Sequence, residues 1–139
     1  MEKTLVILKP DAVSKGLEKQ IVRKYEAAGL KMVKRKGMDA VPALLKQHYS
    51  AHIQKPFYPS LERFMSSGPV VAIIFEGKDA IAIARKVTGA TDPAKAEKGT
   101  VRAEFGDMKL PDDDRIMKNL VHASATKEEA EKEIQLWFG

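Results

Sequence analysis

The sequence contains no cysteine among its 139 residues. Disulfide bonds, thiolate nucleophiles, cysteine-based zinc sites and iron–sulfur clusters are therefore excluded. Long hydrophobic runs are missing as well: the longest, Val70–Phe75, has six residues, whereas a helix needs about 20 to cross a bilayer. Only five residues separate Met1–Lys3 from Lys9, which is too few for the apolar part of a signal peptide. We expect neither a membrane span nor a signal peptide, and hence a cytoplasmic protein.

The length and composition are those of one globular domain, which we expect to span residues 1–139. Folding at this length buries roughly two-thirds of the surface of the unfolded chain, so a core can form without disulfide bonds or bound metals. Lys and Arg outnumber Asp and Glu by 24 to 19, which gives a net charge of +5. This balance favours anionic partners such as nucleotides, nucleic acids or acidic lipids. The densest basic cluster, residues 31–36, is by itself typical of a solvated face.

Segments with strand-like and helix-like periodicity alternate along the chain. Apolar and β-branched stretches predict strands at residues 4–8, 30–40, 70–75 and 119–122. Apolar residues spaced three and four apart predict helices at 17–28, 42–49, 61–65, 80–88 and 127–137. Residues 90–118 show little periodicity and are expected to form a long loop. The order favours an α/β (α+β) fold of the ferredoxin-like βαββαβ type, an antiparallel sheet with helices packed on one face.

Side-chain capping is expected at the starts of two of these helices. Asp79 precedes the helix at 80–88 and can accept a hydrogen bond from its first turn. Thr126, followed three residues later by Glu129, is a capping-box pattern for the last helix.

The most informative chemical feature lies in the last predicted helix. Ala130, Glu133, Ile134 and Trp137 have the spacing of one helical face, so Glu133 lies within an apolar stripe. A carboxylate there needs a partner, and His122, in the strand before the helix, is the nearest candidate. Such a carboxylate would fix the histidine tautomer and leave the other ring nitrogen free as nucleophile or base. The spacing equally allows Glu133 to lie at the edge of the stripe and reach solvent.

Three separate basic side chains could together bind a polyphosphate. Strand alternation places Lys9 on the same face as Leu5 and Ile7, at the end of the first strand. Arg85 lies on the helix after the third strand, and Arg102 lies in the predicted loop. Guanidinium groups bind phosphate oxygens in a fork, and an ammonium group supplies a point charge. Each residue alone is typical of a solvated position, and no GxxxxGK[ST] loop is present, so side chains would have to hold the phosphate.

The remaining clusters carry weaker signals. His48 and His52 have the spacing of paired metal ligands on a helix, but no HExxH motif or third ligand accompanies them. The three aspartates at 112–114 could bind a hard cation or form a solvated turn. Phe57 and Tyr58, between two prolines, could fill a hydrophobic gap or stack on a base. Their isolation from other aromatics argues against a nucleic-acid-binding sheet surface.

Five blocks of sequence match one known family in order: TLVILKPDAV at 4–13, HYSAHIQKPFY at 48–58, SGPVVAIIFEG at 67–77, ARKVTGATDPAKAEKGTVRAEF at 84–105 and NLVHAS at 119–124. With these blocks the chain resembles nucleoside diphosphate kinases along essentially its full length. The resemblance implies a ferredoxin-like α/β sandwich, in agreement with the predicted order of elements. It also implies a ping-pong reaction in which a histidine carries the γ-phosphoryl group from a nucleoside triphosphate to a nucleoside diphosphate.

The same resemblance implies roles for individual catalytic residues. His122 matches the nucleophile of the family, and Glu133 matches the residue that orients it. Lys9 and Tyr49 match groups near the transferred phosphate. Such an arrangement suits phosphoryl transfer, because its loose transition state needs positioning and cations more than covalent machinery.

Further residues are implied to bind the nucleotide. Arg85, Thr91 and Arg102 match phosphate ligands, Asn119 matches a contact to a sugar hydroxyl, and Phe57 matches the aromatic ring on which the base stacks. Stacking tolerates every base, so broad nucleotide specificity is expected, with ATP as the expected donor. Mg²⁺ is expected on the nucleotide phosphates rather than in a protein cage. The resemblance further implies a homo-oligomer, either a tetramer or a hexamer.

The chain departs from the family pattern after the histidine and in the long loop. The family commonly has HGSDS or HASDS, whereas residues 122–126 here read HASAT, so the acidic residue is missing and Ser124 remains. We expect activity to survive, because Thr126 can still cap the last helix. The stretch between Arg102 and Asn119 is longer than in typical members, with additional sequence at 106–115.

Two other functions compete with the enzyme. A basic ferredoxin-like module could bind nucleotides or nucleic acid without turnover; for nucleic acid, binding would depend on salt and would survive loss of His122. A catalytically weak regulator could bind nucleotides through the same pocket. Formation of a phosphoenzyme and turnover distinguish the kinase from both alternatives, and we do not expect nucleic acid to be a partner.

Overall fold

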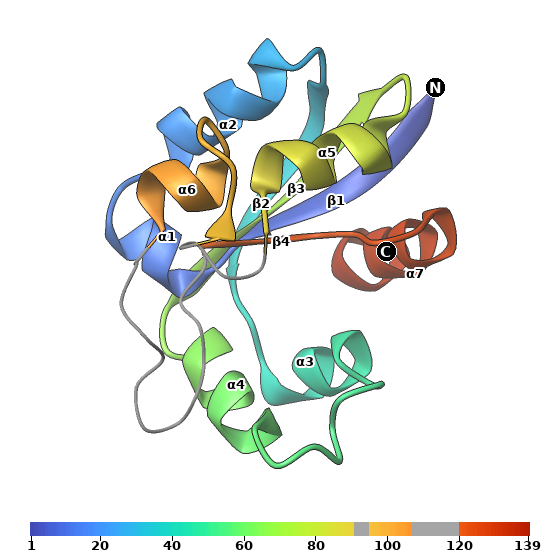
Figure 1. The fold of residues 1–139 in the computed structure, drawn as a ribbon. Helices are drawn as coiled ribbons and strands as arrows, with labels where there is room; N and C mark the ends of the chain where they lie inside the picture. Colours follow the sequence, from blue (N-terminus) through green and yellow to red (C-terminus); the bar gives the residue numbers. More distant parts are fainter. Residues whose placement is uncertain (91–94, 107–119) are drawn as a thin grey trace.

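Four strands form a single antiparallel sheet in the computed structural model, which describes residues 1–90, 95–106 and 120–139. The strands are β1 (Glu2–Leu8), β2 (Lys31–Asp39), β3 (Pro69–Gly77) and β4 (Val121–Ala123), in the order β2-β3-β1-β4 (Figure 1). The helices are α1 (Pro10–Ser14), α2 (Glu18–Ala27), α3 (Pro42–His48), α4 (Tyr58–Met65), α5 (Ala80–Thr88), α6 (Val101–Phe105) and α7 (Lys127–Phe138). The ferredoxin-like prediction is confirmed.

Helices cover both faces of the sheet, so the prediction that they cover one face is wrong. Val6 and Leu8 of β1 pack into a core with residues of α1, α2, α5 and α6. Leu5 and Ile7 point the other way, into a second core with residues of α3, α4 and α7. The helices of the two cores lie on opposite sides of the sheet (Figure 1). A strand whose consecutive residues are all apolar must be covered on both sides, because successive side chains point to opposite faces.

The register of β4 determines the face to which its histidine points. Val6 pairs with Ala123, Ile7 with His122, and Leu8 with Val121. Residues opposite each other in a ladder share a face, so His122 points to the side of Ile7, where α3 and α7 pack. β4 leads directly into α7, which begins at the Thr126 cap.

The first strand ends where the first helix begins. Pro10 is the first residue of α1, a position at which proline needs no N–H partner. The sequence pattern indicated only the end of the strand at this proline, and the five-residue α1 was not predicted. α6, also five residues, lies within the stretch predicted as a loop; Thr100 caps it by accepting a hydrogen bond from the Ala103 N–H.

The two predicted caps have different outcomes. The Thr126 hydroxyl accepts a hydrogen bond from the Glu129 N–H at 3.1 Å, which confirms the cap of α7. Asp79 precedes α5 but makes no side-chain capping bond, so that prediction is wrong. Asp79 adopts a left-handed backbone (φ 54°), and the carboxylate of Glu2 instead accepts the Ile81 N–H at 2.9 Å.

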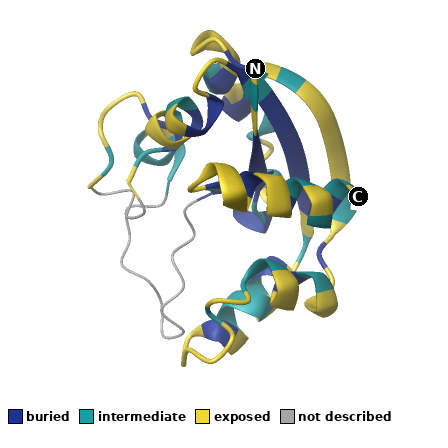
Figure 2. Cartoon of the chain, turned by 90° about the vertical axis from the view of Figure 1, so that its right-hand side faces the viewer, coloured by how far each residue is buried: buried dark blue, intermediate teal, exposed yellow. Residues whose placement is uncertain are grey.

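β2 forms the exposed edge of the sheet. It pairs with β3, and most of its residues are exposed (Figure 2). The basic cluster at residues 31–36 lies on this strand. Among the described residues, no helix is both long and apolar enough to cross a membrane.

Candidate active site

His122 and Glu133 form a direct hydrogen bond at the base of the site. Nε2 of His122 lies 3.0 Å from Oε1 of Glu133, which projects from the buried face of α7. An ionised carboxylate can only accept hydrogen bonds, so Nε2 carries the proton and Nδ1 carries the lone pair. The His122 side chain keeps 22% of its surface exposed. The alternative in which Glu133 reaches solvent is therefore wrong.

A second hydrogen bond holds Glu133 in place. The hydroxyl of Ser124, which is fully buried, donates to the same Oε1 at 2.6 Å. Burial by itself raises the pKa of the Glu133 carboxyl, but the hydrogen bonds and charge of His122 and the Ser124 hydroxyl outweigh burial and lower it. Glu133 is therefore a carboxylate at neutral pH, fixed by two donors.

His48 packs behind the His122–Glu133 pair from the end of α3. Its Nδ1 accepts a hydrogen bond from Nε1 of Trp137 at 3.0 Å, and its ring meets that of His122 edge-on with centroids 4.6 Å apart. Burial, followed by the neighbouring charge of His122, lowers the pKa of His48 to about 3. A neutral His48 thus packs against the His122 ring without adding a competing charge.

Tyr49, the residue after α3, extends this aromatic cluster. Its ring packs edge-on against His48 at 4.6 Å and lies 6.4 Å from the ring of Tyr58. Burial, then the Glu133 charge, raises the pKa of the Tyr49 hydroxyl above its usual value, so it stays protonated. The structure therefore places this predicted residue beside the histidine cluster, as a neutral hydroxyl.

Two predicted arginines converge on the backbone of β4. Arg102, on α6, donates to the carbonyl of Val121 at 2.7 Å and to that of Gly89 at 3.0 Å. Arg85, on α5, donates to the carbonyl of Ala123 at 3.3 Å. Burial lowers the pKa of Arg102, and the nearby Arg85 lowers it further. The two guanidinium groups thus bind the carbonyls of the residues directly before and after His122.

Lys9 supplies a third cation at the end of β1. Its N–H continues the ladder by donating to the carbonyl of Leu120 at 2.8 Å. Burial and the charge of Arg102 lower the pKa of Lys9 to about 8, while Asp11 opposes this shift. Lys9 is therefore largely charged at neutral pH, but it loses its proton at a lower pH than an exposed lysine does.

Phe57 lies apart from this cluster, directly before α4. The residue is 37% exposed, with the Lys55 ammonium 5.8 Å from the ring centre and the His52 ring at 6.1 Å. Among the described residues no hydrogen bond or ring contact joins Phe57 to His122. Two other predicted nucleotide ligands, Thr91 and Asn119, lie outside the described residues, as do the aspartates at 112–114 and the additional sequence beyond Gly106.

The spacing of His48 and His52 does not place them on one helical face, because α3 ends at His48. His48 instead joins His122 and Glu133, whose potential ligand atoms all lie within 4.8 Å of one another. In the hydrogen bonds described above, Nδ1 of His48, Nε2 of His122 and Oε1 of Glu133 are already engaged. We therefore interpret the group as a hydrogen-bonded scaffold for the histidine.

Three contributing residues were not assigned a role from the residues alone: Ser124, His48 as a packing partner, and Asp11. Trp137 was placed in the stripe of Glu133, but its bond to His48 spans 89 residues of sequence. A signal existed for Trp137, since it lies one helical turn after Glu133 and an indole N–H needs a partner when buried. No sequence signal indicated that His48 of α3 would be this partner.

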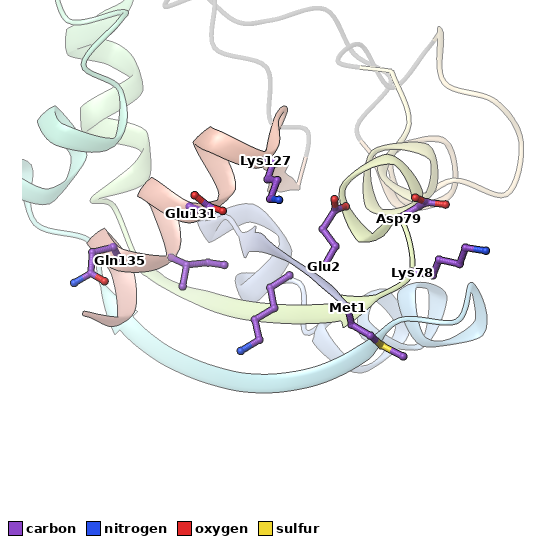
Figure 3. Close-up of a pocket in the computed structure, with 9 residues that line it drawn as sticks. Met1, Glu2, Lys78, Asp79, Lys127, Glu131 and Gln135 are labelled. Carbon is purple, nitrogen blue, oxygen red and sulfur yellow. The ribbon is translucent and has the colours of Figure 1, made fainter.

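A separate open pocket of about 660 Å³ lies between the start of β1 and α7 (Figure 3). Its lining contains Glu2, Asp79 and Glu131 together with Lys3, Lys78 and Lys127, so charges of both signs are interspersed. None of the predicted site residues that the structure describes lines it. Its geometry therefore supports no part of the candidate site.

Comparisons with known proteins agree with the geometry. The chain matches the family described as nucleoside diphosphate kinase over residues 2–139. It is 45% identical to a nucleoside diphosphate kinase of Trichormus variabilis over 99% of this chain and 88% of that protein. One of Symbiobacterium thermophilum is likewise 45% identical, over 100% of this chain and 88% of that protein.

Solved structures give the same result. The crystal structure of apo nucleoside diphosphate kinase from Encephalitozoon cuniculi superposes with a TM-score of 0.90 at 36% identity, covering 100% of this chain and 90% of that chain. A halophilic nucleoside diphosphate kinase from Halobacterium salinarum, solved in complex with CDP, gives 0.89 at 41% identity, covering 99% and 87%. The chain therefore belongs to the nucleoside diphosphate kinase family of nucleotide phosphotransferases.

Proposed function

We propose that this enzyme transfers the γ-phosphoryl group of a nucleoside triphosphate to a nucleoside diphosphate by a ping-pong mechanism, with Nδ1 of His122 as the carrier. The observation that carries the proposal is the 3.0 Å bond between Nε2 of His122 and Glu133. Because that bond occupies Nε2, the lone pair on Nδ1 is the one available to attack phosphorus.

Each half-reaction breaks one bond and forms one. In the first, Nδ1 attacks the γ-phosphorus, and the bond to the bridging oxygen breaks to release the nucleoside diphosphate. The proton on Nε2 stays in place, so the ring gains positive charge that the Glu133 carboxylate stabilises. In the second, a terminal oxygen of another nucleoside diphosphate attacks the phosphohistidine, and the histidine returns to its neutral form.

The surrounding residues position the phosphates and the base. Lys9, Arg85 and Arg102 provide positive charge where negative charge spreads over the phosphoryl oxygens, and the protonated Tyr49 hydroxyl supplies a donor beside the histidine cluster. We assign Thr91 to the phosphates, Asn119 to the sugar and Phe57 to the base. The exposed ring of Phe57 supports stacking without selection among bases.

We propose that Mg²⁺ enters with the nucleotide. Within the described residues, the one group of three potential ligands contains two imidazoles, whereas Mg²⁺ prefers oxygen ligands. Mg²⁺ held by phosphate oxygens would neutralise part of their charge. No protein cage is therefore assigned to the metal.

We further propose that residues 1–139 form a single domain that assembles as a homo-oligomer, a tetramer or a hexamer. Two hydrophobic cores around one sheet support the single domain. The exposed nine-residue β2 supports assembly, since an unpaired strand edge is a template for pairing with another chain. ATP is the proposed donor, and the cytoplasm, where a chain without cysteine suits the reducing conditions, is the proposed compartment.

The proposal is tested by phosphoenzyme formation. Purified protein is mixed with Mg²⁺ and γ-labelled ATP, isolated, tested for acid lability of the label, and chased with GDP. We expect acid-labile label that moves to GDP, that is absent in His122→Ala, and that is retained in His52→Ala. His52 is the matched control because it is a histidine outside the His122 cluster. Absence of label under conditions where nucleotide binds would contradict the proposal and favour a binding protein.

A further inference from the structure

Asp11 holds the backbone that leads into the strand of the nucleophile. It is the second residue of α1, and only 7% of its surface is exposed. Its Oδ2 accepts the N–H of Leu120 at 3.0 Å. Its other oxygen, Oδ1, is fully buried and accepts no hydrogen bond from the described residues. A buried carboxylate with an oxygen that accepts no hydrogen bond is costly.

Leu120 is the residue that turns the chain into β4, two residues before His122. Its φ of 75° lies in the left-handed region, which is unfavourable for a residue other than glycine. Both of its backbone polar groups are held by the junction between β1 and α1, since the Lys9 N–H donates to its carbonyl and Asp11 accepts from its N–H. These two bonds keep the strained turn in place.

Asp11 also contributes negative charge among the cations of the site. It raises the pKa of Lys9, whereas burial and Arg102 lower it. Burial and the charge of Arg85 lower the pKa of Arg102, and Asp11 opposes that shift. Among the described residues, the charged and titratable groups that act on Lys9 include Asp11 from α1, Arg102 from α6 and the neutral His48 at the end of α3. Within this group, Asp11 is the anion.

We propose that Asp11 is a positioning residue for phosphoryl transfer, which fixes the turn before His122 through Leu120 and supplies the negative charge that accompanies Lys9 and Arg102. This inference rests on the proposed phosphohistidine mechanism. Asp11 acts through the backbone of β4 and through Lys9, and it makes no contact with the reacting atoms.

The charge is tested with Asp11→Asn, which keeps the shape and an oxygen acceptor for the Leu120 N–H. The pH dependence of kcat/KM between about pH 6 and about pH 10 reports the loss of the Lys9 proton in the free enzyme. We expect its alkaline limb to move to lower pH by about one unit in Asp11→Asn. The control, Asp79→Asn, removes the same charge at an exposed turn and should leave the limb unmoved. An unmoved limb in a folded Asp11→Asn would overturn this part of the inference.

The backbone bond is tested with Asp11→Ala, which removes the acceptor. We expect the rate of phosphoenzyme formation to fall at least about tenfold, with KM for nucleotide within about threefold, because binding groups stay while the nucleophile shifts. If Asp11→Ala does not fold, the bond to the Leu120 N–H can still be tested by measuring amide hydrogen exchange in the wild-type protein. The Leu120 amide should be as protected as those of β1, and rapid exchange there would overturn the inference.

Failure of this inference is distinguishable from failure of the proposed function. If the wild-type protein forms no acid-labile label on His122, the mechanism itself is wrong. If the wild type is labelled but the Asp11 variants behave like Asp79→Asn, the mechanism stands and the role of Asp11 is wrong.

Discussion

Glu133→Gln is the substitution that should separate orientation of the nucleophile from nucleotide binding. Oε1 of Glu133 accepts from Nε2 of His122 at 3.0 Å and from the Ser124 hydroxyl at 2.6 Å. Glutamine keeps the shape but loses the charge that stabilises the ring once Nδ1 is phosphorylated. Its NH₂ group can also donate to the ring, which favours the tautomer whose Nδ1 is protonated and unable to attack.

The size of the effect follows from the bond that is weakened. Hydrogen bonds to charged groups contribute about 1.5–3 kcal/mol, and each 1.4 kcal/mol of barrier corresponds to a factor of about ten in rate. The first-order rate of phosphoenzyme formation should therefore fall roughly 10- to 100-fold. KM for nucleotide should change little, because Lys9, Arg85 and Arg102 are untouched.

Rapid-quench measurement of acid-labile label at saturating ATP gives this rate directly. Glu131→Gln is the matched control, since it removes an exposed carboxylate from the same helix. A folded Glu133→Gln enzyme with a rate within about threefold of Glu131→Gln would refute the reasoning.

Three further outcomes are expected. The pKa of His48 is about 3 in the folded protein, below its unfolded value. The contribution of His48 to the free energy of unfolding should therefore be full above about pH 6.5 and decrease as the pH falls toward 3. His48→Asn should flatten this decrease, as measured by chemical unfolding monitored through Trp137, the only tryptophan. Ser124→Ala should lower the free energy of unfolding by about 2 kcal/mol, because it removes a buried bond to Glu133, while slowing phosphoenzyme formation less than Glu133→Gln; equal slowing would contradict this order. Phe57→Ala should raise KM by about tenfold for purine and pyrimidine nucleotides alike, and a selective effect in steady-state assays would contradict simple stacking.

Much of the fold could be predicted because its signals are local. The apolar runs of β1 and β3 and the helical stripe of α7 each lie within a dozen residues, and all three elements form where expected. α1 and α6 were missed because five residues are too few to show helical periodicity. Strands that are apolar on both faces indicate that both faces of the sheet are covered, but the predicted arrangement placed helices on one face only.

In the site, too, only the features with a local sequence signal could be predicted. The pairing of His122 with Glu133 could be predicted because a carboxylate in an apolar stripe needs a partner and the nearest histidine is in the preceding strand. The position of His48 beside His122 and Glu133 could not be predicted, because it depends on how α3 packs beside α7. The bond from Asp11 to Leu120 joins residues 109 apart in sequence, and no pattern in the sequence relates them.

The central claim is that Nδ1 of His122 carries the phosphoryl group while Nε2 remains bound to Glu133. NMR of the ¹⁵N-histidine-labelled phosphoenzyme, with phosphorus couplings resolved, identifies the phosphorylated nitrogen without a substitution. The structure predicts phosphate on Nδ1 of His122 and a retained proton on Nε2. Phosphate on Nε2, or on His48 or His52, would contradict the mechanism.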